Sequence, residues 1–279
     1  MRWLRSDRHG DLPLILEALR RDRLRNVSVL KYLLAFPQNS LALQVQTAGR
    51  VATALLLEQR VVDYDRQAYP TAETIIFLQS GDAELTRHLM TAFPQDRIIV
   101  FKLMSTVDEA VLAAGFPLER QRGYMTYTTS KAPDLPSSAR LETAADGLPF
   151  DLFAAQGHAA GWVRCMVETG RAFASVYRAA DAPLATCLAF ELDEGLWEIG
   201  ALYTVPDARG RGLGRQVVTT ALRTILEAGH IPRYHVEDSN MASMTLAQGL
   251  GLSRAQVLTH FLSVPGRAHP VTTASPASL

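Results

Sequence analysis

Three glycines lie within five residues in the segment 209–215, which reads RGRGLGR. An apolar strand pattern precedes this segment and an amphipathic helix pattern follows it. Glycine at this density costs backbone entropy, so the segment needs positive φ angles or close approach of a ligand to the backbone. A turn that opens into a helix N-terminus directs several N–H groups and the positive end of the helix dipole at one point. The segment therefore predicts a binding site for phosphate.

The residues around these glycines exclude two common phosphate motifs. A nucleoside-triphosphate loop requires Gly-x4-Gly-Lys-Ser/Thr, and no Lys-Ser/Thr pair follows Gly214. A dinucleotide-binding turn requires Gly-x-Gly-x-x-Gly, whereas Gly210, Gly212 and Gly214 are spaced Gly-x-Gly-x-Gly. The pattern that remains is Arg-x-x-Gly-x-Gly, starting at Arg209. The alternative is a surface turn whose glycines have no ligand.

This pattern resembles the pyrophosphate-binding motif of the GNAT superfamily, the acyl-CoA-dependent N-acyltransferases. The segments that accompany it in the family are also present: YTVP at 203–206, a strand pattern at 234–237, Asn240-x-x-Ser243-x-x-Leu246, and Leu-Gly-Leu at 250–252. The resemblance implies acetyl-CoA, or another acyl-CoA, as co-substrate. It implies that the coenzyme is bound by Leu202, Tyr203, Thr204, Arg209, Gly210, Arg211, Gly212, Leu213, Gly214, Arg215 and Asn240.

Acyl transfer from a thioester to an amine requires an amine that has lost its proton. A lysine-like ammonium titrates near pH 10.4, so the free base at pH 7 costs about 4.6 kcal/mol, and a carboxylate must accept the proton. Glu198 lies on the strand that leads to the glycine segment, in a placement that resembles the glutamate bases of some GNAT enzymes. We assign it as the candidate general base. The alternative is that Glu198 is a structural carboxylate paired with a neighbouring group. A bulge in the strand would change the face of the sheet on which the Glu198 side chain lies.

The departing thiolate needs a proton, and here the chain departs from the family. Many members carry a tyrosine seven residues after Asn240, where this chain has Ala247. Tyr203 is the candidate catalytic residue in its place, and Tyr234 and His235 are further candidates. Packing within a strand is the alternative role for each of them. A thiolate with a pKa near 8.5 can also leave without help.

The predicted elements occur twice along the chain in one order: hairpin, strand, helix, strand, helix, strand. In the first half they lie at 41–46, 50–58, 74–78, 81–92, 97–103, 107–114 and 123–129. In the second half they lie at 173–178, 183–192, 197–205, 215–228, 234–237 and 240–249, followed by a strand holding His260 and Phe261. A basic amphipathic helix at 11–25 precedes the first set, and a helix with His158 and Trp162 precedes the second. We interpret the repetition as a tandem duplication; chance similarity is the alternative.

The two halves differ where the second carries RGRGLG. The first half has QSGDAE at 79–84, with one glycine and the carboxylates of Asp82 and Glu84. Carboxylates suit a helix N-terminus but repel a pyrophosphate there. The N-terminal half is therefore predicted to be a degenerate copy that does not bind coenzyme A and serves architecture or acceptor recognition.

These patterns predict an α/β (α+β) fold of two tandem GNAT-like domains, each a mostly antiparallel sheet with a central splay, flanked by helices. We place the degenerate domain at 1–129, a linker at 130–139, the acyl-CoA-binding domain at 140–264 and a flexible tail at 265–279. The linker contains the proline- and serine-rich segment SKAPDLPSS, and the tail is rich in Pro, Ala, Ser and Thr.

Composition restricts the possible partners. Lys plus Arg equals Asp plus Glu at 28 each, so no overall charge attracts nucleic acid or an anionic membrane. Two cysteines without metal-ligand spacing predict no metal and a reducing cytoplasmic setting. The sequence thus predicts an N-acyltransferase, most simply an acetyltransferase, that acts on a small-molecule or peptide amine by direct attack in a ternary complex. The alternatives are a non-catalytic acyl-CoA sensor or scaffold and a glycine N-acyltransferase-like enzyme with a longer acyl donor.

Overall fold

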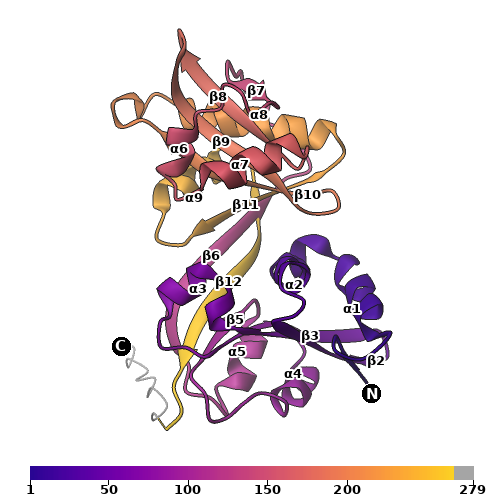
Figure 1. Ribbon diagram of the computed structural model, residues 1–279. Helices are drawn as coiled ribbons and strands as arrows, with labels where there is room; N and C mark the ends of the chain where they lie inside the picture. Colours follow the sequence, from indigo (N-terminus) through magenta and orange to yellow (C-terminus); the bar gives the residue numbers. More distant parts are fainter. Residues whose placement is uncertain (267–279) are drawn as a thin grey trace, which may run out of the picture. The chain divides into compact units, whose positions relative to one another are not determined.

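The computed structural model describes residues 1–266, and the chain forms two compact units (Figure 1). Unit 1 comprises residues 1–123 together with the chain from Val257, and unit 2 comprises residues 124–256. The greater part of the tail predicted at 265–279 lies outside the described residues. Among residues 1–266, no helix has the length and apolar character needed to cross a bilayer.

Unit 1 is a sheet with helices on both faces, in the strand order β1-β2-β3-β4-β5-β12. All of its neighbouring strands are antiparallel except β4 and β5. The strands are β1 (Arg2–Arg5), β2 (Ser40–Thr47), β3 (Arg50–Glu58), β4 (Thr74–Gln79), β5 (Ile99–Leu103) and β12 (Ser253–Ser263). The helices are α1 (Asp11–Arg20), α2 (Arg23–Ala35), α3 (Asp63–Ala68), α4 (Ala83–Met90) and α5 (Thr106–Leu112), with a 3-10 turn at Gln59–Val61.

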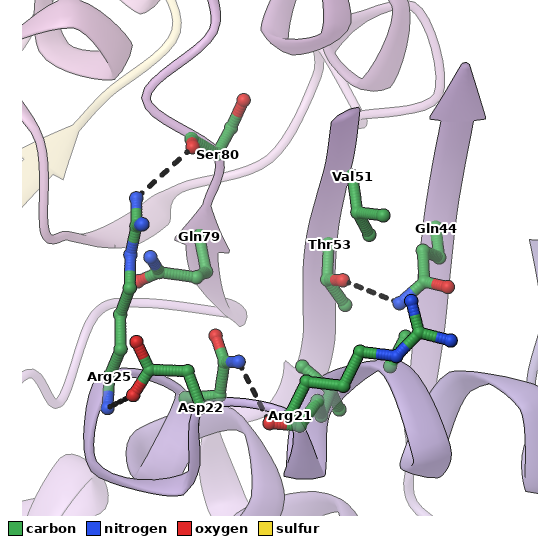
Figure 2. Close-up of a pocket in the computed structure, with 11 residues that line it drawn as sticks. Arg21, Asp22, Arg25, Gln44, Val51, Thr53, Gln79 and Ser80 are labelled. Carbon is green, nitrogen blue, oxygen red and sulfur yellow. Dashed lines mark hydrogen bonds between the residues drawn. The ribbon is translucent and has the colours of Figure 1, made fainter. Parts of the chain in front are cut away.

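Two cores form in unit 1, one on each face of the sheet. The helices α1, α2 and α3 pack on one face, and α4 and α5 pack on the other. The helix predicted at 11–25 is divided into α1 and α2 because Asp22 leaves the helical conformation. Its carboxylate caps α2 by accepting a hydrogen bond from the amide of Arg25 at 3.0 Å (Figure 2).

Unit 2 repeats this plan, in the strand order β6-β11-β10-β9-β8-β7. The strands are β6 (Glu119–Thr128), β7 (Arg140–Glu142), β8 (Ala172–Ala179), β9 (Ala182–Asp193), β10 (Leu196–Thr204) and β11 (Ile231–Glu237). The helices are α6 (Phe150–Ala154), α7 (Ala160–Glu168), α8 (Leu213–Glu227) and α9 (Met241–Gly249), with a 3-10 turn at Pro206–Ala208. The helices α6 and α7 cover one face of the sheet, and α8 and α9 cover the other.

The helix α8 holds the glycine segment in place. Its apolar residues recur at the 3–4 spacing of one helix face, and Val217, Ala221, Leu222 and Ile225 are all buried against the sheet. Burial of a side chain of the size of Leu222 stabilises the fold by about 1.5–3 kcal/mol. The N-terminus of α8 is therefore fixed on β10 and β11 by its packed face.

The structure divides the chain differently from the predicted domain boundaries. The strand predicted at 123–129 was placed with the N-terminal domain, but Tyr124 pairs with Glu237 and Tyr127 with Tyr234, within unit 2. Residues up to 264 were placed with the C-terminal domain, but Thr259 pairs with Leu103 within unit 1. Each unit is thus completed by a strand that follows the other unit's last helix. Sequence periodicity predicts that a strand exists, but not which strand it pairs with.

Candidate functional site

The glycine segment forms a tight loop between the Pro206–Ala208 turn and α8. Gly210 and Gly212 have φ angles of 74° and 75°, and Gly212 is the N-cap residue of α8. A Cβ atom at either position would meet no atom within 4 Å. The left-handed backbone, rather than lack of space, is therefore what favours glycine at both positions.

The amides of this loop are unused by the protein. The N-cap residue of α8 provides no side-chain hydrogen bond. Within residues 1–266, the backbone N–H groups of residues 210–215 donate no hydrogen bond to a protein acceptor. A cluster of unsatisfied donors at the positive end of a 15-residue helix is an anion-binding arrangement.

These amides face a cleft of about 840 Å³. The cleft extends from the loop along the end of β10 and the length of α9. Its lining residues are Gln156, Leu202, Tyr203, Thr204, Ala208, Arg209, Gly210, Gly212, Leu213, Gly214, Arg215, Asn240, Ala242, Ser243, Thr245, Leu246 and Gly249.

The sheet opens beside this cleft. The parallel pairing of β10 with β11 ends at Ile199 and Tyr234, although β10 continues to Thr204 and β11 to Glu237. The register of β10 with β9 shifts between Gly200 and Tyr203, and Ala201 has a φ angle of 48°. A bulge of this kind bends the strand and increases its local twist. The predicted splay of the central strands is therefore present in unit 2.

At Gly214 the helix packs against α9 and the splayed strand at distances that leave ordinary contact space for a Cβ atom. A Cβ atom there would lie 3.4 Å from Leu246 Cδ1 and 3.7 Å from Thr204 Oγ1. Two arginine side chains are anchored at the same end of the helix by main-chain acceptors. Arg209 Nε donates to the Thr204 carbonyl at 3.2 Å, and Arg215 Nη2 donates to the Gly249 carbonyl at 2.7 Å. Both cations line the cleft and add to its attraction for an anion.

Comparisons with known proteins agree with this geometry. The family model described as FR47-like protein matches residues 184–260, which include β10, the glycine loop, α8 and β11. A mycothiol acetyltransferase from Kineococcus radiotolerans is 34% identical over 90 residues, which cover 31% of this chain. That match spans 29% of the length of the relative, so it compares only one segment of the two proteins.

Solved structures extend the likeness to the whole fold. A GNAT-family acetyltransferase from Colwellia psychrerythraea has a TM-score of 0.59 at 13% identity, over 95% of this chain and all (100%) of that chain. A GCN5-related N-acetyltransferase from Kribbella flavida has a TM-score of 0.53 at 16% identity, over 88% of this chain and 96% of that chain. Residues 184–260 thus match the FR47-like family model, and the chain has the fold of these GNAT acetyltransferases.

The residues that the GNAT resemblance assigns to coenzyme binding gather at this cleft, and their binding of a coenzyme stays a prediction. All the predicted coenzyme-binding residues line it except Arg211. Ser243 and Leu246, which belong to the recognised sequence pattern without having been assigned to binding, line it as well. Gln156 comes from the loop between α6 and α7 and was missed, because no local pattern in that loop indicates a ligand. Asn240 is the N-cap residue of α9, and its Oδ1 accepts a hydrogen bond from the amide of Ser243 at 3.0 Å.

The candidate base is held in an ion pair. Glu198 pairs in parallel register with Arg233, and the guanidinium of Arg233 donates a hydrogen bond to its Oε2. The side chain of Glu198 is 16% exposed and that of Arg233 is 3% exposed. Glu198 does not line the cleft beside the glycine loop, and the bulge of β10 separates it from Leu202 and Tyr203. His158 stacks on Trp162, which contacts Phe190, the antiparallel register partner of Glu198.

The position of the usual GNAT acid is apolar, but a hydroxyl pair lies close to it. Ala247 is completely buried. Tyr234 Oη lies 2.5 Å from Oγ of Ser243, which lines the cleft. Burial raises the pKa of Tyr234 to about 12, so the phenol stays protonated at neutral pH. His235 instead hydrogen-bonds Thr126 at 2.9 Å and stacks on Tyr124. Tyr203 lines the cleft itself.

Unit 1 has carboxylates where unit 2 has open amides. Asp82 caps α4, and its Oδ1 accepts from the amides of Glu84 and Leu85 at 3.0 and 3.1 Å. The buried carboxylate of Asp108 accepts from the amides of Gly81 and Ser80. In the corresponding loop of unit 1, four backbone donors are therefore already bound to the protein's own carboxylates, those of Ser80, Gly81, Glu84 and Leu85.

Proposed function

We propose that the protein is an N-acyltransferase that transfers an acetyl group from acetyl-CoA to a primary amine. The open amides of residues 210–215, which face a cleft beside splayed strands, are the observation that carries this proposal. They bind the pyrophosphate of the coenzyme, and Arg209 and Arg215 add charge at the same end. Each charge-assisted N–H···O contact contributes about 1.5–3 kcal/mol, against about 0.3–1 for the helix dipole, so the aimed amides dominate the binding.

The splay orients the thioester. Beyond Ile199 the backbone of β10 has no partner strand on its β11 side. In our proposal the backbone groups of Leu202, Tyr203 and Thr204 hold the pantetheine arm and polarise the thioester carbonyl. The amine then attacks this carbonyl directly, which forms the C–N bond and expels the thiolate of coenzyme A.

Two proton transfers complete the reaction. Glu198, positioned by Arg233, accepts the ammonium proton through water, because its carboxylate does not line the cleft. The thiolate receives its proton from Ser243, which takes one in turn from the phenol of Tyr234 across their 2.5 Å contact. The nitrogen loses its second proton as the amide forms, and this proton returns through solvent to the phenolate of Tyr234. Tyr203 is the alternative donor, since it lines the cleft without an intermediary.

A non-catalytic acyl-CoA sensor is the second candidate. The ion pair of Glu198 and the apolar Ala247 favour it, because both depart from what a GNAT active site uses for proton transfer. A longer acyl donor, as in glycine N-acyltransferases, would be accepted by the same anion-binding loop.

Thiol release separates these candidates. The full-length protein is incubated with acetyl-CoA and a panel of small primary amines and peptide N-termini, and products are identified by mass spectrometry. Acetylated amine and equimolar thiol support the enzyme. Coenzyme A binding without product across the panel supports the sensor, and turnover with hexanoyl-CoA but not acetyl-CoA supports the longer donor.

A further inference from the structure

The acyl end of the donor reaches Gly200 when coenzyme A follows the cleft as proposed above. The cleft leads from the loop 210–215 along β10 to Leu202, where the pantetheine arm ends in the thioester. The next residues in the same direction along β10 are Ala201 and Gly200. Two residues of extended chain span at most about 7 Å, so Gly200 lies within that distance of Leu202. Gly200 is also the first residue of β10 beyond its last paired row with β11.

The ring of Phe190 lies over Gly200. A Cβ atom at Gly200 would lie 3.4 Å from Phe190 Cε1 and 4.0 Å from its Cζ. Carbon atoms that are not bonded to each other stay about 3.5–4.0 Å apart, so no acyl chain passes between this ring edge and the backbone. The ring extends from β9 toward β10 on the face covered by α6 and α7, where Ala201 packs as well. It therefore limits the space beyond the thioester at the point where the strands separate.

A neighbouring indole holds Phe190 in this place. Trp162 of α7 packs edge-on against Phe190, with 5.4 Å between the ring centroids and 81° between the ring planes. His158 in turn stacks on Trp162, with 5.5 Å between centroids and 23° between planes. Phe190 also packs against the apolar core under α6 and α7. Because Phe190 contacts Gly200, Trp162 and this core at once, it cannot turn aside without losing packing.

We propose that Phe190 is the specificity-determining residue for the acyl donor, and that Trp162 is its positioning residue. The site accommodates an acetyl group, whereas a longer chain meets the ring edge above Gly200. This inference rests on the acyl transfer proposed above and decides a point left open there, the length of the acyl group. Phe190 does not line the coenzyme cleft, so its effect falls on the acyl chain and not on the diphosphate.

The relative rates with three acyl donors test this inference. The kcat/KM of the full-length protein is measured by thiol release for acetyl-CoA, propionyl-CoA and hexanoyl-CoA, with the amine acetylated fastest in the panel above as acceptor. One added methylene changes such a ratio about 10- to 200-fold, so propionyl-CoA is expected to react at least about tenfold more slowly than acetyl-CoA. Hexanoyl-CoA is expected to react at least about a hundredfold more slowly.

Three variants relax this preference to different extents. Phe190→Ala is expected to bring hexanoyl-CoA within about tenfold of acetyl-CoA, because the ring that excludes the chain is removed. Phe190→Leu keeps more of the apolar core and is expected to give an intermediate ratio, and it decides the test if the alanine variant does not fold. Trp162→Ala releases the ring and is expected to relax the ratio in part.

Phe173→Ala is the matched control, because Phe173 lies on the neighbouring strand β8 and packs with Trp197 on the other face of the sheet. It is expected to keep the wild-type ratio, and coenzyme A affinity, measured by calorimetry, is expected to be the same in all these proteins.

The inference is overturned if the wild type uses hexanoyl-CoA as readily as acetyl-CoA. It is also overturned if the Phe190 variants keep the wild-type ratio, or if they change only the KM of the amine. Turnover without this selectivity contradicts the inference alone, whereas no turnover with any donor and any amine contradicts the proposed function and the inference with it. The two failures are therefore distinguishable.

Discussion

Glu198 and Arg233 face each other across the parallel strands β10 and β11, and the guanidinium donates a hydrogen bond to the carboxylate. This pairing holds the candidate base at the last paired rows of the two strands, next to the point where they separate. A base in this position acts from within an ion pair, and Arg233 is its positioning residue.

Replacement of Glu198 by glutamine is expected to lower kcat for amine acylation by about a hundredfold, the range of a general base, because glutamine cannot accept the proton. The KM for acetyl-CoA is expected to change less than twofold, roughly, since Glu198 does not line the coenzyme cleft. Glu191→Gln is the matched control, because Glu191 is a strand glutamate of the same unit near Arg171. Circular dichroism checks that both variants fold. If Glu198→Gln acylates the amine at the wild-type rate at every pH from 6 to 9, Glu198 is not the general base.

The contact between Tyr234 and Ser243 predicts a rate effect that depends on pH. Tyr234→Phe and Ser243→Ala are each expected to lower kcat about tenfold at pH 7, because the departing thiolate then lacks its proton donor. The pKa of Tyr234, raised by burial to about 12, keeps the donor protonated at any pH below that value. A thiol with a pKa near 8.5 needs no proton above about pH 9, so variant and wild-type rates converge there. A deficit that stays constant with pH points to a structural effect.

Acid should destabilise unit 1 through His260. Burial, followed by the charges of Lys102 and Arg122, lowers the pKa of His260 to about 2. The unfolded chain binds this proton below about pH 6.5 and the folded chain does not, so stability falls as pH drops through 6.5. The loss amounts to about 1.4 kcal/mol at pH 5.5. The variant His260→Gln is expected to lose this part of the acid destabilisation. The control His9→Gln, at an exposed position, is expected to keep it. Hydrogen exchange of the β5 amides reports the difference, and equal acid sensitivity in both variants contradicts the assignment.

Lys102 and Asp65 form a buried ion pair in unit 1, with 2.6 Å between Nζ and Oδ1 and side chains 2% and 0% exposed. Lys102→Met or Asp65→Leu alone is expected to cost about 3–5 kcal/mol, because one charge remains buried without its partner. The double variant should cost less than either single one. The exposed pair of Arg60 and Glu58 serves as a control, and its coupling energy is expected to stay below about 1 kcal/mol. If the change in the free energy of unfolding of the double variant equals the sum of the two single changes, Lys102 and Asp65 are not coupled.

Local sequence patterns predicted the glycine loop, the helix that follows it and the duplicated order of elements. These features depend on residues close together in sequence, such as Gly210 and Gly212, for which the spacing predicted either positive φ angles or close approach of a ligand, and both have positive φ angles. The pairing of Glu198 with Arg233 and the pairing of Thr259 with Leu103 depend on strand register between distant segments. No single-sequence pattern specifies that register, so these contacts and the exchanged strands could not be predicted.

The central claim is that the main-chain amides of residues 210–215 bind the diphosphate of coenzyme A. Calorimetry with coenzyme A on the wild type, Gly212→Glu and Gly10→Glu tests it directly. Both glycines are N-cap residues with φ angles of 75° and 84° and no side-chain cap, so both variants acquire similar backbone strain and one carboxylate at a helix N-terminus. We predict equal coenzyme affinity for the wild type and Gly10→Glu, and a loss of at least about a hundredfold for Gly212→Glu. Equal uptake of coenzyme A by all three proteins, or none by the wild type, would contradict the claim.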